Sequence, residues 1–397
     1  MFLILTETSK KFKFPKKLEA RGIMQESIVD YFMELVKIDS ESKQEKQIAL
    51  KLQTDLEEMG ARVEFDDAHS KTGGEIGNLY AYFDGDTCQS PILFCSHLDT
   101  VVPGTGVKPQ LKEDRITSDG TTVLGADDKS GIAQVISAIK ELQQSGEKLP
   151  PIELLFTISE EIGLLGSRYA DYAKLHAKFG YALDAHYIGD LTIGAPSEKS
   201  IKLTVHGKEA HAGMAPEKGI SAIRLAAEAI LAAPQGRIDE QTTCNIGIIS
   251  GGVATNIVPN KVEIKAEVRS HDDDKLANTT QKIIDSFKDT VKKHKTENFE
   301  PTVDVELGQR YRSFRISEEE EMVKLALRVN KKLGIDIKPS VGGGGSDANN
   351  FNEHGIKAVI AGTGMRSVHT TEEFILLEDL KKGKEWVKEI IKEYAKD

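Results

Sequence analysis

The sequence predicts an α/β protein with a mixed, mostly parallel sheet flanked by helices, interrupted by a smaller α+β domain. Three short runs, 91–95, 152–159 and 181–183, are apolar throughout, which is typical of strands that helices bury on both faces. A helical pattern over about 130–144 separates the first two runs, and this strand–helix–strand rhythm indicates parallel strands. Near residue 198 the pattern changes to alternating apolar and polar residues, which indicates half-exposed strands.

The first predicted domain opens with two helices. Apolar residues recur at helical spacing over 28–38. Ser42 and Glu45 have the spacing of a capping box, which predicts the start of a second helix that ends at Gly60. Beyond the inserted domain the α/β rhythm resumes with three elements: a helix near 318–333, a strand at 358–361 and a terminal helix from about residue 378.

The inserted domain combines strands with a helix. The segments 201–205 and 262–268 alternate apolar and polar residues, and 244–250 is a further predicted strand. An alanine-rich helix is expected over 220–233. Strands with one solvent-exposed face, and with helices on their other face, predict a small two-layer α+β unit.

These patterns predict a discontinuous first domain, residues 24–197 and 311–397, around an insert of residues 198–310. Residues 1–22 hold six basic and two acidic side chains. Their apolar stretch precedes the basic residues and is only five residues long, which is the wrong order and length for a signal peptide. We expect residues 1–23 to be a disordered N-terminal extension.

Composition narrows the classes of function. The chain has 397 residues, 39% hydrophobic and 29% charged, which suits two or three cores. Lys and Arg number 52 against 63 Asp and Glu, and the resulting net charge of −11 argues against nucleic acid as a partner. No apolar run approaches the roughly 18 residues of a membrane span, so no membrane partner is expected. Three cysteines without a C-x-x-C pair favour a reducing, cytoplasmic compartment.

Candidate functional residues follow the ends of the predicted strands. His97 and Asp99 follow the first buried strand at a spacing that puts both on one side of an extended segment. Glu160 and Glu161 end the second strand, and Asp184 follows the third. Taken singly, each has a plain interpretation as a surface pair or a solvated loop. Two adjacent carboxylates at a strand end are less easily explained so, because ligands of α/β sheets bind there.

Two further candidates complete a metal-binding set. Asp127 opens the 130–144 helix beside Asp128, and helix capping accounts for one aspartate better than for two. His369 follows the 358–361 strand. Imidazole and carboxylate ligands without thiolate suit zinc, with manganese or cobalt as alternatives. The ligands suffice for two ions roughly 3.5–4 Å apart that share a carboxylate and a water.

Five motifs occur in a fixed order along the chain: His97-Leu-Asp99, the segment 117–131 around Gly-Ala-Asp127-Asp, Ser159-Glu-Glu-Ile-Gly163, Gly207-Lys-Glu-Ala-His211 and the segment 251–259. Together they resemble the co-catalytic zinc aminoacylase/carboxypeptidase family, and its peptidase T branch most closely. The resemblance covers nearly everything after Met24, and it implies that the insert is a lid through which homodimers form.

The resemblance implies a ligand set for two zinc ions. Asp127 matches the bridging ligand of the family. His97 and Asp184 match the remaining ligands of one zinc, and Glu161 and His369 match those of the other.

The resemblance also implies roles outside the ligand set. Asp99 matches the aspartate that hydrogen-bonds the first histidine ligand, and Glu160 matches the general base. His211 matches a lid histidine that contacts the scissile carbonyl. Asn256 and Arg269 match positions that bind carboxylate or carbonyl groups of the substrate.

The expected function is a metal-dependent exopeptidase for short peptides, an aminotripeptidase, in which a water between two zinc ions attacks and Glu160 is the base. The alternative with the same dizinc core is an amidohydrolase of N-acyl amino acids or dipeptides. A non-catalytic binding module is disfavoured, because every ligand position carries a suitable residue. No lysine follows the glycines at 342–345 as a phosphate loop requires, and the resemblance places Ser346 and Asp347 beside the substrate cleft.

Overall fold

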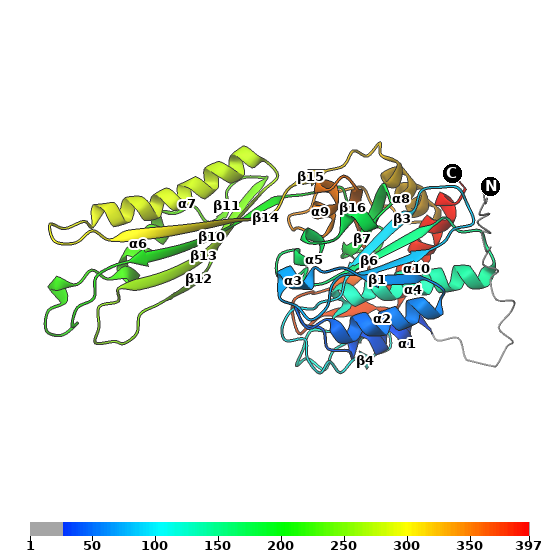
Figure 1. The fold of residues 1–397 in the computed structure, drawn as a ribbon, viewed down its shortest axis with the longest axis horizontal. Helices are drawn as coiled ribbons and strands as arrows, with labels where there is room; N and C mark the ends of the chain where they lie inside the picture. Colours follow the sequence, from blue (N-terminus) through cyan, green and yellow to red (C-terminus); the bar gives the residue numbers. More distant parts are fainter. Residues whose placement is uncertain (1–26, 397) are drawn as a thin grey trace, which may run out of the picture.

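A computed structural model describes residues 27–396, so the extension predicted at 1–23 lies outside the described residues. Figure 1 shows two lobes, a rounded one and an elongated one. We call residues 197–311, which form the elongated lobe, the lid, and the other described residues the main domain. The predicted boundaries at 198 and 310 remain a proposal. No helix among the described residues is long and apolar enough to cross a membrane.

The main domain is built on a seven-stranded sheet in the order β1-β2-β6-β3-β7-β16-β8. Its central pairs, β3 with β6, β3 with β7 and β7 with β16, are parallel, while the outer pairs are antiparallel. The strands are β1 (Arg62–Phe65), β2 (Leu79–Phe83), β3 (Ile92–His97), β6 (Ile152–Thr157), β7 (Phe179–Ala185), β8 (Leu191–Thr192) and β16 (Lys357–Gly362). The predicted fold class, a mixed and mostly parallel sheet, is confirmed.

Helices cover this sheet and complete its core. The long α4 (Ala126–Ser145) is buried along most of its length and packs against β3 and β7, with α10 (Leu377–Tyr394) and α1 (Ile28–Val36) beside it. The other helices of the main domain are α2 (Lys46–Glu58), α3 (His69–Thr72), α5 (Leu165–Arg168), α8 (Glu321–Lys332), α9 (Ala348–Glu353) and a 3₁₀ turn at Tyr172–Lys174. Because β3, β6 and β7 are buried on both faces, their apolar runs were recognisable in the sequence.

Two small sheets join segments around the main sheet. One has the order β17-β18-β5-β4 and the other pairs β15 with β9. Their strands are β4 (Gln110–Leu111), β5 (Arg115–Thr117), β9 (Gly194–Ala195), β15 (Phe314–Arg315), β17 (Met365–Arg366) and β18 (Phe374–Leu376). The pairing of β9 with β15 holds together the two chain segments that lead into and out of the lid.

The lid is an antiparallel sheet in the order β11-β12-β13-β10-β14 with its own hydrophobic core. Two helices, α6 (Ala222–Ala232) and α7 (Asp273–Lys293), pack on this sheet. The strands are β10 (Ser197–His206), β11 (Gly236–Arg237), β12 (Thr242–Gly251), β13 (Lys261–Ser270) and β14 (Thr302–Tyr311), and a 3₁₀ turn spans Pro216–Lys218. The lid thus confirms a separate α+β unit inserted into the α/β fold.

Candidate metal centre

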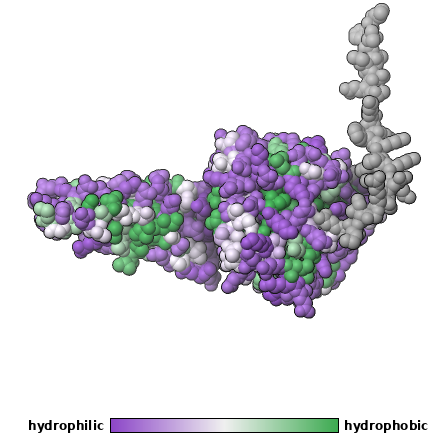
Figure 2. All heavy atoms as spheres, turned by 90° about the horizontal axis from the view of Figure 1, so that it is seen from below, coloured by the Kyte–Doolittle hydropathy of each residue, from purple (hydrophilic) through white to green (hydrophobic). Residues whose placement is uncertain are grey.

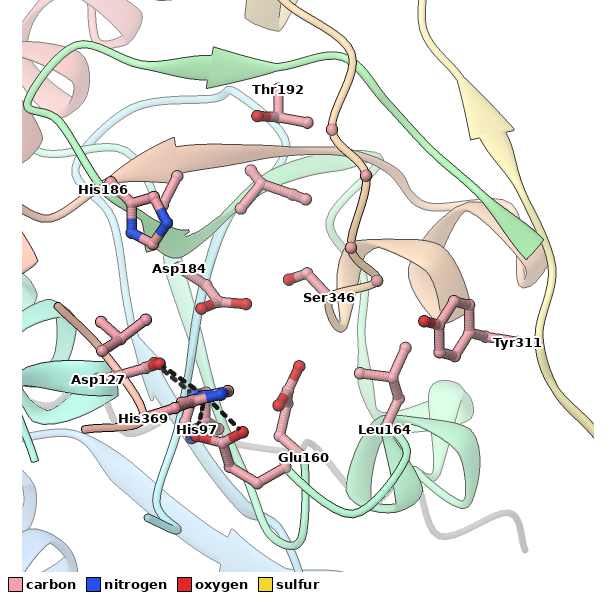
Figure 3. Close-up of a pocket in the computed structure, with 18 of the residues that line it drawn as sticks. His97, Asp127, Glu160, Leu164, Asp184, His186, Thr192, Tyr311, Ser346 and His369 are labelled. Atoms are coloured by element: carbon pink, nitrogen blue, oxygen red, sulfur yellow. Dashed lines mark hydrogen bonds and ion pairs between the residues drawn. The ribbon is translucent and has the colours of Figure 1, made fainter. Parts of the chain in front are cut away.

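A cavity of about 500 Å³ opens where the parallel strands β3, β6 and β7 end. It is lined by all the predicted ligands and the predicted base: His97, Asp127, Glu160, Glu161, Asp184 and His369. The labelled members of this set converge on one space in Figure 3. They meet because the carboxyl ends of neighbouring parallel strands lie at one edge of the sheet. We call this space the catalytic cavity.

Asp127 lies between two imidazoles. Its Oδ1 is 3.0 Å from Nε2 of His97, and its Oδ2 is 3.3 Å from Nε2 of His369. A carboxylate oxygen of Glu161 also lies 2.9 Å from Nε2 of His369. The two oxygens of Asp127 therefore face different histidines, as a carboxylate that bridges two cations would.

The donor atoms of this cavity fit a metal ion. One donor atom each from His97, Asp127 and Glu161 lie within 4.8 Å of one another. Nδ1 of His97 faces the backbone oxygen of Asp99 at 2.9 Å, which leaves Nε2 for a metal. Nitrogen and oxygen donors without sulfur suit zinc, manganese or cobalt.

Burial and neighbouring charges shift the proton affinities in the cavity. Burial first, and then the charge of Asp127, raise the pKa of Asp184 to about 8. Hydrogen bonds to Asp127 and Glu161 raise the pKa of His369 to about 10. Burial also raises the pKa of Glu160 well above its ordinary value. Divalent cations stabilise such a concentration of carboxylates, so the charges fit the predicted metal site as well.

The Asp99 carboxylate supports the site from the interior of the main domain. It is fully buried and accepts hydrogen bonds from the backbone N–H groups of Glu160 (2.9 Å) and Glu161 (3.2 Å). Its Oδ1 is 3.5 Å from Nδ1 of His97, farther than the Asp99 backbone oxygen. Asp99 therefore fixes the loop that carries the predicted base at least as directly as it orients His97.

Ser42 and Glu45 do not form the predicted capping box. Ser42 donates its hydroxyl to Asp99, and Glu45 accepts the backbone N–H groups of Lys43 (2.8 Å) and Ser159 (2.9 Å). The prediction was wrong because both side chains find partners beside the catalytic cavity rather than at the start of α2. Burial and the nearby charge of Asp99 raise the pKa of Glu45 to about 7.

Glu373 is a buried residue that the sequence did not single out. Its carboxylate accepts the backbone N–H groups of Leu124 (2.7 Å), Gly125 (2.7 Å) and Asp127 (2.9 Å). Glu373 follows His369 by four residues. Its carboxylate therefore links the loop that carries His369 to the chain segment that leads into Asp127. The one sequence signal for Glu373 was that it belongs to an acidic pair shortly after His369, a candidate ligand.

The end of the lid that joins the main domain contributes a second charged cluster to the catalytic cavity. Buried Glu198 accepts a hydrogen bond from the hydroxyl of Tyr311 (2.8 Å) and pairs with Arg269 (3.2 Å) and Arg310 (3.3 Å). Arg269 thus lines the cavity, as its predicted contact with substrate requires. The other three residues had no sequence signal, since Glu198 and Tyr311 are 113 residues apart.

Comparison with known proteins decides the family. A model of peptidase family M20/M25/M40 matches residues 93–393. The chain belongs to this family. It is therefore an M20 metallopeptidase, a hydrolase of peptide bonds, as the sequence motifs predicted.

Similar proteins include a solved PepT and a solved tripeptidase. The aminopeptidase PepT of Bacillus cereus is 41% identical, with a TM-score of 0.82, over 93% of this chain and 98% of its own. A tripeptidase of Staphylococcus aureus is 36% identical, with a TM-score of 0.87, over the same shares. The Bacillus subtilis protein YqjE, described as uncharacterized, is 39% identical over 94% of this chain and its whole length. The resemblance to peptidase T is confirmed.

In this M20 peptidase, His211 and Asn256 lie away from the catalytic cavity. Both are exposed on the lid and neither lines that cavity. Nδ1 of His211 accepts the backbone N–H groups of Gly213 and Met214, both at 3.2 Å. The neutral ring therefore carries its proton on Nε2. The predicted roles of both residues require the lid to move or a second copy to approach.

The glycine run at 342–345 lines the catalytic cavity of this M20 peptidase beside Ser346. A Cβ on Gly345 would lie 2.3 Å from the ring of Tyr311, so only glycine fits there. Asp347 is buried and accepts hydrogen bonds from hydroxyls of β6 and α5. The resemblance placed both residues beside the substrate cleft. In the structure Ser346 faces the catalytic cavity, whereas Asp347 holds the segment that follows the glycine run in place.

Proposed function

We propose that this M20 peptidase is an aminopeptidase that removes the first residue of tripeptides with two zinc ions. His97, Asp127, Glu161, Asp184 and His369 would hold the two ions. The observation that carries the proposal is the position of Asp127 between two imidazoles in a cavity that Glu160, Glu161 and Asp184 also line. The PepT and tripeptidase relatives support the substrate class.

The proposed proton carrier is Glu160. It lines the catalytic cavity, and its carboxylate forms no hydrogen bond or ion pair with any described residue. Bound zinc would acidify water and polarise the peptide carbonyl. Glu160, whose pKa burial raises, takes a proton from the attacking water and delivers it to the leaving amine. Its backbone N–H is fixed by Asp99, so the carboxylate is held in place during this transfer.

His211 is the proposed donor to the developing oxyanion. Its neutral ring has a free Nε2–H, which suits a hydrogen bond to a carbonyl oxygen. Closure of the lid, or a second subunit, would bring it to the catalytic cavity. Asn256 lies beside it, because the backbone N–H of Ala212 donates to the Asn256 carbonyl at 2.9 Å. The two residues would therefore arrive together.

We also propose a homodimer through the lid. Beyond Thr243 and Cys244, which pair with β11, the outer edge of β12 has no strand partner among residues 27–396. Ile248 and Ile249 on this strand are 54% and 53% exposed, and Val253 is 83% exposed. Figure 2 shows hydrophobic residues gathered on the lid. An apolar, unpaired edge of this kind favours association, and a monomer mass in analytical ultracentrifugation would contradict it.

We place the activity in the cytoplasm. The thiols of Cys88, Cys95 and Cys244 form no disulfide with one another. A chain with free thiols suits a reducing compartment.

A substrate panel tests the proposed function. Zinc-loaded protein is incubated with a tripeptide, the dipeptide of its first two residues, and the N-acetylated forms of both. We expect the unblocked tripeptide to give the highest kcat/KM and to release its N-terminal residue. Preferential cleavage of the dipeptide or of an acylated substrate would replace the tripeptidase assignment by the amidohydrolase alternative.

A further inference from the structure

A second cavity, of about 760 Å³, adjoins the catalytic cavity. Arg269, Gly342 and Gly343 line both spaces, so the two share a wall. The lid and the main domain both contribute to its lining. Its basic residues are Arg237, Arg269, His271 and Arg315. We call this space the arginine cavity.

The arginine cavity is cationic although the chain has a net charge of −11. Glu240 is the one acidic residue among the described residues that line it. Glu198 and Glu267 neutralise Arg269. In contrast, no side chain within residues 27–396 forms a hydrogen bond or ion pair with the guanidinium of Arg237 or Arg315. Two guanidinium groups are therefore available to an anion.

His271 also lines the arginine cavity. Burial lowers the pKa of its imidazole, and the charge of Arg315 lowers it further. An anion bound beside both side chains would raise this pKa again and so favour the cationic imidazole.

The shared wall leaves room for a chain to pass. A Cβ built on Gly343 would meet no atom within 4 Å. Gly342 is closer to its surroundings, since its Cβ would lie 3.0 Å from the Thr192 side chain. A backbone without side chains at this point does not fill the space between the two cavities.

We propose that the arginine cavity binds the C-terminal carboxylate of a peptide whose first bond lies in the catalytic cavity. The inference rests on the proposed peptidase function and names the residues that recognise the far end of its substrate. Arg237 and Arg315 present planar N–H groups that match a carboxylate. Recognition of the terminal charge would make the enzyme prefer short peptides with a free C-terminus.

The test compares a tripeptide with its C-terminal amide. In the variant Arg237→Gln/Arg315→Gln we expect KM for the free acid to rise about tenfold, because charge-assisted hydrogen bonds are lost. Its kcat should stay unchanged, and so should both constants for the amide. The variant Arg237→Lys/Arg315→Lys keeps the charges and should recover most of the affinity.

Arg312→Gln is the matched control. Arg312 is near Arg315 in the chain, pairs with Glu353 and lines neither cavity, so its loss should leave KM unchanged. Equal changes for acid and amide, or no change for either, would overturn the proposal. Inorganic phosphate is the second probe: if the glutamine variant abolishes inhibition by phosphate but keeps the wild-type KM for the peptide, the cavity holds free anions instead. Wild-type protein that cleaves neither peptide would refute the proposed function itself.

Discussion

Glu160 and Glu161 are neighbours in the sequence with different surroundings in the fold. Glu161 contacts the imidazole of His369, whereas the Glu160 carboxylate has no partner among residues 27–396. Asp99 holds the backbone of both residues. One carboxylate is thus placed to bind a cation and the other to exchange a proton.

Glu160→Gln should abolish turnover and leave metal binding intact. The amide keeps the shape of the side chain but cannot accept the proton of the attacking water. We expect kcat to fall by at least about 10²-fold, with an unchanged metal content measured on the same sample. Near-normal kcat would remove Glu160 from the role of base.

Glu45→Gln should change the pH dependence of stability. The unfolded chain ionises Glu45 near pH 4.5, whereas the folded protein keeps its proton up to about pH 7. Stability therefore falls as the pH rises through this interval, because the unfolded state releases this proton while the folded state retains it. Glutamine keeps the accepting oxygen for Lys43 and Ser159 and carries no charge.

Urea unfolding of wild type and Glu45→Gln at pH 5 and pH 8 checks this expectation. We expect the variant to be roughly 1–3 kcal/mol more stable than wild type at pH 8 and about equal at pH 5. A variant that is less stable at pH 8 would show that the ionised carboxylate is favourable in the fold.

Two loops far apart in the chain are joined by Glu373. The loop before α4 leads into Asp127 in the first, non-helical turn of that helix, and the loop before β18 carries His369. The three backbone N–H groups that Glu373 accepts hold the first loop against the second. His369 itself has a positive φ of 62°, a conformation that non-glycine residues rarely adopt without support from their surroundings.

Glu373→Gln should weaken metal binding. The amide group of glutamine would face backbone N–H groups that now meet carboxylate oxygens, so the loop of Asp127 loses its fixed position. We expect metal affinity, measured by competition with a chelator, to fall about 10–100-fold. Glu372→Gln is the control, because that neighbour is exposed. Equal affinities of the two variants would show that the contact does not position the ligands.

The sequence predicted the elements whose pattern is set by burial alone. The buried strands β3, β6 and β7 and the apolar helix α4 were recognisable from their own residues. The edge strand β1 and the buried strand β2 beside it were missed, and so was α7, whose apolar positions lie among many charged ones. Glu373 and Glu198 act through contacts between distant segments, and no local pattern contains such contacts.

The lid and the main domain have separate hydrophobic cores, and near the catalytic cavity the ring of Tyr311 on the lid lies close to Gly345 of the main domain. The proposed ligands and the proposed base lie in the main domain, while His211 and Asn256 lie on the lid away from the cavity. A cycle that needs both sets of residues therefore depends on the position of the lid. The resemblance predicted the two sets of residues, but a sequence does not specify how far apart two domains rest.

His211→Ala tests whether the lid reaches the reaction. Loss of a donor to the oxyanion should lower kcat by about 10²-fold or more, with unchanged zinc content. Steady-state kinetics and elemental analysis of the same preparation measure both quantities. Unchanged kcat would mean that the lid histidine takes no part in the reaction.

The central claim is that Asp127 bridges two metal ions held by the four ligands around it. Elemental analysis of wild-type protein and of Asp127→Ala by mass spectrometry tests it most directly. We predict two zinc ions per chain in the wild type and fewer than one in the variant. A single ion per wild-type chain, or two ions retained after Asp127 is replaced, would contradict the account.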